Sequence, residues 1–152
     1  MGGEQGLAGM TSDQRILVVD DDDAIRALLQ TVLRRRGLRV DAARNGVDAL
    51  EKLGARSYAL VVLDLMMPRM SGYELLDYLS RQPVLTRPRV LVLTAGLDTR
   101  LFPADFATDL VIGTVHKPFD IEMLVDVVTA FLSAETHHEE QPPETVELTS
   151  LN

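Results

Sequence analysis

Five polar residues of this sequence follow short apolar runs, at places where their side chains could act together. Asp20 and Asp21 follow residues 16–19, Asp64 follows residues 60–63, Thr94 follows residues 90–93, and Lys117 comes shortly after residues 110–112. Three carboxylates brought together repel one another unless one is protonated or a cation binds between them. Oxygen ligands without histidine suit a hard divalent ion, and Mg²⁺ is the best match.

The same residues predict phosphoryl-transfer chemistry. A magnesium ion with open positions attracts phosphoryl oxygens, Lys117 adds a second positive charge, and Thr94 offers a hydroxyl. A carboxylate can attack phosphorus and form an acyl phosphate, which makes Asp64 the candidate nucleophile. Alone, Thr94 would more often be an ordinary strand residue and Lys117 an ordinary surface lysine, so the argument depends on their meeting at one place.

Alternation of two apolar patterns indicates how these residues could meet. The four apolar runs, with a weaker one at residues 39–43, are typical of strands buried on both faces of a parallel sheet. Between them, Ile25, Leu28, Leu29, Val32 and Leu33 fall on one face of a helix,. Five strand–helix repeats predict an α/β three-layer sandwich with right-handed crossovers. Its ligand site is expected beyond the carboxyl ends of the strands.

Four motifs in this order resemble the receiver domains of response regulators. They are Ile16-Leu17-Val18-Val19-Asp20-Asp21, Leu63-Asp64-Leu65-Met66-Met67-Pro68, Thr94-Ala95 and Lys117-Pro118-Phe119. The resemblance covers residues 14–132. It implies the flavodoxin-like fold of chemotaxis receivers, with five parallel strands in the order 2-1-3-4-5.

The resemblance also implies a role for each motif residue. Asp20, Asp21, Asp64 and the backbone carbonyl of Met66 would bind Mg²⁺. Asp64 would accept a phosphoryl group from a histidine kinase or a phosphotransfer protein. The phosphoryl group would be bound by Thr94, Ala95 and Lys117, and the loops shaped by Pro68, Gly72 and Pro118, with a cis bond before Pro118. Asp22 and Asp23 are expected to cap the first helix rather than bind metal.

Two features depart from the family pattern. The switch of these domains pairs the threonine, here Thr94, with an aromatic residue three positions before the lysine, and that position holds Thr114. Between Leu97 and Ile112, Pro103 interrupts the region where the fourth helix is expected,. We therefore expect an atypical fourth helix that is short, displaced or poorly ordered. Phe102 or Phe106 could supply the missing aromatic group, although core packing is the more common role.

Charge and composition delimit the domain. Of the net charge of −8, the expected disordered leader (residues 1–13) and the expected acidic tail or linker (133–152) carry −7, which leaves 16 acids and 15 bases between them. This balance argues against nucleic-acid binding. The absence of cysteine, of a signal peptide and of a membrane-length apolar run favours a cytoplasmic protein,.

Three alternatives or additions stay open. A pseudo-receiver, a binding module of this fold that is never phosphorylated, would tolerate the missing aromatic but would not need three repelling carboxylates. Asp20-x-Asp22 is similar to the motif of haloacid-dehalogenase phosphatases, but Ala24 departs from it and the chain is short for such an enzyme. We therefore predict no enzyme beyond catalysis of the domain's own phosphorylation and dephosphorylation. Met123, Val127 and Ala130 on the last helix predict a surface for a second copy or an effector protein.

Overall fold

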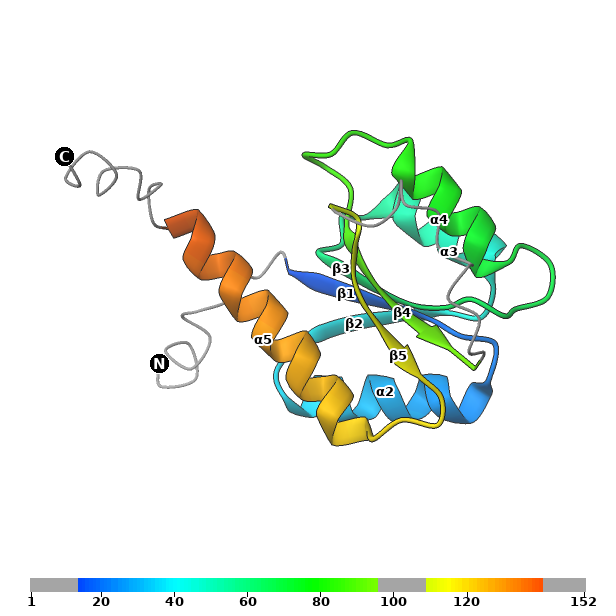
Figure 1. Cartoon of the computed structure of the whole chain (residues 1–152), viewed down its shortest axis with the longest axis horizontal. Helices are drawn as coiled ribbons and strands as arrows, with labels where there is room; N and C mark the ends of the chain where they lie inside the picture. Colours follow the sequence, from blue (N-terminus) through cyan, green and yellow to red (C-terminus); the bar gives the residue numbers. More distant parts are fainter. Residues whose placement is uncertain (1–13, 96–108, 141–152) are drawn as a thin grey trace, which may run out of the picture.

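The protein forms a five-stranded parallel sheet with helices on both faces (Figure 1). The computed structural model describes residues 14–95 and 109–140, with side chains to Glu135. The strand order is β2-β1-β3-β4-β5, which confirms the predicted flavodoxin-like arrangement. The strands are β1 (Arg15–Val19), β2 (Arg39–Ala43), β3 (Leu60–Asp64), β4 (Arg89–Thr94) and β5 (Val111–His116).

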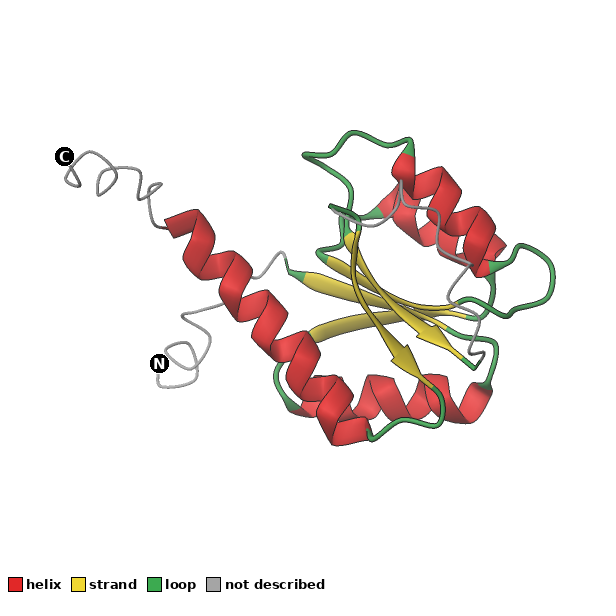
Figure 2. Ribbon diagram, viewed as in Figure 1, coloured by secondary structure: helices red, strands yellow, loops and turns green. Residues whose placement is uncertain are grey.

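The helices lie on either side of the sheet (Figure 2), and two apolar clusters hold them against its faces. The helices α2 (Asp23–Arg35) and α5 (Ile121–Glu140) pack on one face, and α3 (Gly46–Ala55) and α4 (Gly72–Ser80) on the other. Strand β3 lies at the centre and is buried along its whole length, because both of its faces meet a helix layer. Apolar residues without alternation are the sequence signature of such a strand. The buried strands β1 and β3 therefore fix the positions of Asp20, which follows β1, and Asp64, which ends β3.

Local hydrogen bonds set where the helices begin. Asp22 caps α2, since its side chain accepts hydrogen bonds from the backbone N–H groups of Ala24 and Ile25. Ser71 and Glu74 form a capping box at the start of α4,. Asp120 precedes α5 and its carboxylate accepts the N–H of Glu122. After α2, Gly37 takes a left-handed conformation with φ of 85°, which ends the helix,. The cap at Asp22 confirms the expectation for the first helix.

Some boundaries differ from the expectations. Strand β5 runs from Val111 to His116 rather than over residues 110–112, because its later residues lie at the sheet edge and lack the continuous apolar pattern of a central strand. Helix α5 continues beyond Leu132 to Glu140, so the first part of the expected tail is helical. Alanine and glutamate favour helix, and no glycine or proline intervenes before Pro142,.

Two expectations fall outside the described residues. The atypical fourth helix and the two phenylalanines, Phe102 and Phe106, belong to residues 96–108, which the structure does not describe. The same holds for the leader at residues 1–13 and for residues 141–152 of the tail. Among the helices within the described ranges, none is long and apolar enough to cross a membrane.

Candidate functional site

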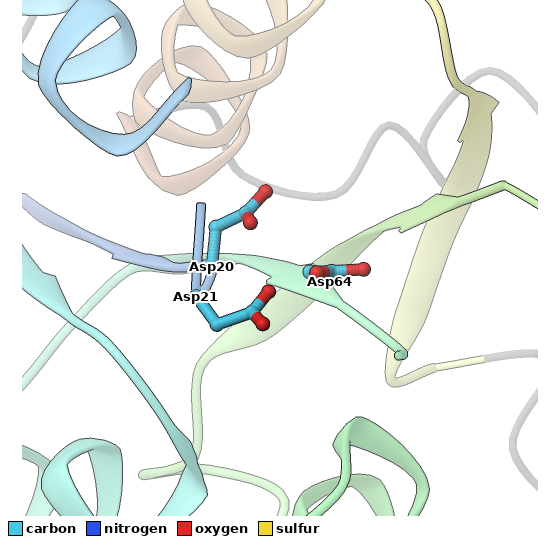
Figure 3. A group of neighbouring side chains, drawn as sticks. All are labelled: Asp20, Asp21 and Asp64. Carbon is cyan, nitrogen blue, oxygen red and sulfur yellow. The ribbon is translucent and has the colours of Figure 1, made fainter. Parts of the chain in front are cut away.

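Three carboxylates meet at the carboxyl ends of β1 and β3. One oxygen from each of Asp20, Asp21 and Asp64 lies within 4.8 Å of the others. Asp20 is 0% exposed and Asp64 3% exposed, whereas Asp21 lies on the surface. Figure 3 shows the three side chains projecting from neighbouring strand ends. The parallel sheet brings together residues that are far apart in the sequence, as predicted.

Lys117 joins this group from the end of β5. Its ammonium Nζ lies 3.1 Å from Asp20 Oδ2 and 3.4 Å from Asp64 Oδ2. Its backbone N–H donates to the carbonyl of Thr94 at 2.8 Å, which continues the pairing of β4 and β5 past the last strand residue. The bond to Pro118 is cis, as the family resemblance implied. Lys117 therefore bridges the two buried carboxylates of the site.

The site shifts the pKa of both kinds of charged group. Burial raises the pKa of Asp64 to about 6, and the negative charge of Asp20 adds to the effect. The N–H of Met66, which bonds Asp64 Oδ1 at 3.1 Å, and the charge of Lys117 act in the opposite direction. Burial disfavours the charged form of Lys117, but the hydrogen bond and charge of Asp20 and the charge of Asp64 outweigh it, so its pKa is raised. The ammonium of Lys117 thus compensates the charges of the two carboxylates only in part.

The donor set fits a hard divalent cation. Asp20 Oδ1 accepts the N–H of Asp22 at 2.9 Å, which fixes the orientation of this carboxylate. Asp20 Oδ2 is buried, and the ammonium of Lys117 at 3.1 Å is its partner. That single ammonium faces two buried carboxylates, and buried carboxylate charge that is incompletely paired is stabilised by a further cation,. All the atoms that converge are oxygens, which is the ligand type that Mg²⁺ prefers.

The loop between β3 and α4 is held close to Asp64 by glycines. A Cβ atom on Gly72 would lie 2.6 Å from the Asp64 carbonyl oxygen and 2.6 Å from Leu65 Cα. The N–H of Gly72 also donates to the carbonyl of Leu65 at 3.1 Å. The loop-shaping role predicted for Gly72 therefore has a steric basis. Pro68 lies in this loop, and the metal-binding role of the Met66 carbonyl stays a prediction.

Two further residues of this region were not identified from the sequence. A Cβ on Gly46 would lie 2.6 Å from Met70 Cβ, so this glycine lets the loop pack against the start of α3. Arg69 has a positive φ of 66°, which is unusual for a residue with a side chain,. The Asn45-Gly46 dipeptide is a turn signal that could have indicated the close approach. The positive φ of Arg69 has no comparable signal.

The two predicted switch residues lie in different settings. Thr94 is buried at the end of β4, and Ala95 follows it on the surface of the same rim. Thr114 lies in the edge strand β5, opposite Val92, and its side chain is exposed. The structure therefore brings Thr94 and Ala95 to the rim where the carboxylates lie. Thr114 lies two strand positions before His116, which pairs with Thr94.

Comparison with known proteins identifies the family. The family model of the response regulator receiver domain matches residues 16–129. The chain therefore belongs to the response-regulator receiver family of two-component systems.

Several relatives and solved structures agree with this assignment. The protein Rrf1 of Nitratidesulfovibrio vulgaris is 34% identical over 133 residues, which are 86% of this chain and 91% of the relative. A CpxR homologue of Haemophilus influenzae is 37% identical over 120 residues, 78% of this chain but only 50% of that protein. The chain thus spans about half the length of some relatives and nearly all of another.

The structural comparisons show the same fold. A CheY-like receiver domain of Methanospirillum hungatei matches with a TM-score of 0.71 and 25% identity, covering 84% of this chain and 99% of the other. The response regulator TrrA of Thermotoga maritima, solved in complex with Mg(2+)-BeF, matches with a TM-score of 0.66 and 35% identity over 78% of this chain and 99% of TrrA.

Proposed function

We propose that Asp64 is the phosphoryl acceptor of this domain and that Asp20, Asp21 and Asp64 hold Mg²⁺ for the reaction. The observation that carries the proposal is the convergence of three carboxylate oxygens within 4.8 Å beside the ammonium of Lys117. The phosphoryl donor would be the phosphohistidine of a histidine kinase or a phosphotransfer protein. The Met66 carbonyl would complete the protein ligands. Bound Mg²⁺ would supply positive charge to the phosphoryl oxygens.

The transfer needs an ionised carboxylate. With a pKa of about 6, Asp64 is mostly ionised at neutral pH. An oxygen of Asp64 would form a bond to phosphorus while the phosphorus–nitrogen bond of phosphohistidine breaks, and the imidazole nitrogen would keep the electron pair. Lys117, already 3.4 Å from Asp64 Oδ2, would move its ion pair to the new phosphoryl oxygens,. The Thr94 hydroxyl and the Ala95 N–H would bind a further oxygen.

The signal would leave the domain through β5 and α5. A groove of about 470 Å³ lies between these elements and is lined in part by Ile112, Thr114, Phe119, Met123 and Val127. Met123 and Val127 are exposed. Thr94 would respond to the phosphoryl group, with Thr114 in place of the aromatic partner. A second copy or an effector protein would then bind the α5 face.

Phosphorylation by a small donor tests the proposal without the unknown kinase. The full chain is incubated with phosphoramidate and Mg²⁺, and intact mass spectrometry measures the incorporated phosphoryl group. Wild type should gain one group, Asp64→Asn should gain none, and Asp77→Asn, which changes an exposed carboxylate on α4, should behave as wild type. No gain in wild type, or an equal gain in Asp64→Asn, would contradict the assignment and favour the pseudo-receiver.

A further inference from the structure

Four consecutive aspartates follow β1, and the structure separates them into two pairs. Asp20 and Asp21 belong to the carboxylate cluster. The carboxylate of Asp22 is engaged in capping α2. The carboxylate of Asp23 forms an ion pair with Arg26. A run of four equivalent side chains is thus divided by its partners: Lys117 pairs with the carboxylate of Asp20, and Arg26 pairs with that of Asp23.

Arg26 connects the two ends of this acidic segment. Its Nη1 donates to the backbone carbonyl of Asp20 at 2.8 Å, and its Nη2 donates to the carboxylate of Asp23. The arginine side chain is 19% exposed, whereas that of Asp23 is 89% exposed. The guanidinium therefore lies largely beneath the segment and binds it at both ends. Buried backbone carbonyls are nearly always paired, and that of Asp20 has this side chain as its partner.

Asp20 is consequently held at three points, two on its backbone and one on its side chain. Its N–H donates to the carbonyl of Ala43 at 3.1 Å, its carbonyl accepts from Arg26, and its carboxylate accepts the N–H of Asp22. The adjacent Asp21 is exposed and lies in the segment that these bonds close. With the segment in this conformation, one oxygen of each of Asp20, Asp21 and Asp64 lies within 4.8 Å of the others (Figure 3).

We propose that Arg26 is a positioning residue for the divalent-cation site, acting through the backbone of Asp20 without touching the cation. This inference rests on the proposed function, since the site is the magnesium site of the phosphoryl transfer. Residues that orient metal ligands typically account for about 10- to 100-fold in metal affinity. By holding Asp23 aside, the same side chain keeps the ligand set to the first two aspartates.

The charge of Arg26 and its positioning role predict opposite changes in the affinity for Mg²⁺. A guanidinium beside a cation site repels the cation, so its removal should strengthen binding of Mg²⁺ if Arg26 acted only as a charge. If Arg26 acts by holding the segment in shape, its removal should weaken binding. The sign of the change therefore separates positioning from bulk charge.

The test is a titration of the full chain with Mg²⁺, followed by the amide NMR shifts of Asp21 and Asp64. Arg26→Met should raise the Kd about tenfold, within the range for such residues. Arg34→Met is the matched control, because Arg34 lies on the same helix and also donates to a backbone carbonyl, that of Val40 at 2.8 Å, at the far end of α2. It should leave the Kd unchanged. An equal or lower Kd in Arg26→Met would overturn the inference.

Two further measurements keep the test decisive. Arg26→Lys keeps the charge but carries its donors on one nitrogen, so it cannot reproduce the two-nitrogen fork that binds the Asp20 carbonyl and Asp23 together,. Its Kd should fall between wild type and Arg26→Met, and a Kd equal to that of wild type would count against positioning by the fork even if Arg26→Met failed to fold. In metal-free protein, exchange of the Asp22 amide hydrogen should accelerate in both variants, and unchanged exchange would also overturn the inference. Wild type that binds no Mg²⁺ would refute the proposed function, whereas the exchange rates would still decide the role of Arg26.

Discussion

Replacing Gly72 with alanine should disturb Asp64, the proposed phosphoacceptor. The new Cβ would lie 2.6 Å from both the Asp64 carbonyl oxygen and Leu65 Cα. Ordinary contact begins near 3.4 Å, so the two segments must separate by about 0.8 Å. Both contacted atoms belong to the backbone and cannot be relieved by a rotamer change. Overpacking of this kind costs about 1–3 kcal/mol. We expect a loss of about 2 kcal/mol in the free energy of unfolding.

Gly54 provides a matched control for this change. It lies in α3, and a Cβ there would have nothing within 4 Å. Alanine in a helix is more favourable than glycine by about 0.5–1 kcal/mol, so Gly54→Ala should stabilise the protein by that amount. Urea unfolding followed by circular dichroism measures both variants. Gly72→Ala should also bind Mg²⁺ more weakly, because the new Cβ would displace the backbone of Asp64. Equal unfolding midpoints for wild type and Gly72→Ala would refute the steric reasoning.

Three more predictions concern charged groups. In metal-free protein, the Asp64 carboxyl should titrate near pH 6 when followed by carbon NMR. Because its pKa is raised in the folded state, the free energy of unfolding should fall as pH rises from about 4 to about 6. A titration midpoint near pH 4 would contradict this. Lys117→Met removes the cation that lowers the pKa of Asp64, so the midpoint should move above 6; an unchanged midpoint would refute the electrostatic role. The side chain of Arg87 is buried and donates to three carbonyls at the end of α4 and to Asp109. Arg87→Met should therefore lower the free energy of unfolding by about 3 kcal/mol, whereas Arg81→Ala, at an exposed ion pair, should lower it by about 0.5 kcal/mol or less,. Equal urea midpoints for the two variants would contradict this difference.

The sequence was sufficient for the sheet and for the residues at its rim. Continuous apolar runs identify central parallel strands because both faces of those strands are buried, and the run before Asp64 is fully buried in the structure. Polar residues that end such runs must share one edge of the sheet. That geometric rule, with the family resemblance, predicted the convergence of Asp20, Asp64, Thr94 and Lys117.

Features that depend on tertiary contacts were not predictable in the same way. The strand β5 lies at the edge of the sheet, so its residues are less buried than those of a central strand and its apolar pattern is weaker. Its length was therefore underestimated from the sequence. In α3 the large apolar Val47 is 44% exposed, whereas the small Ala49 is buried, an arrangement that residue type alone does not predict. The role of Arg26 depends on a backbone carbonyl six residues earlier, and no periodicity in the sequence marks such a contact.

The most direct test of the central claim is binding of beryllofluoride, a mimic of the acyl phosphate, in the presence of Mg²⁺. Amide NMR shifts are recorded for wild type and for Asp64→Asn. If Asp64 is the phosphoryl acceptor, wild type should change at Asp64, Thr94 and Lys117, with changes spreading into α5, while Asp64→Asn should not respond. A wild type that shows no magnesium-dependent change, or a variant that responds as wild type does, would contradict the account.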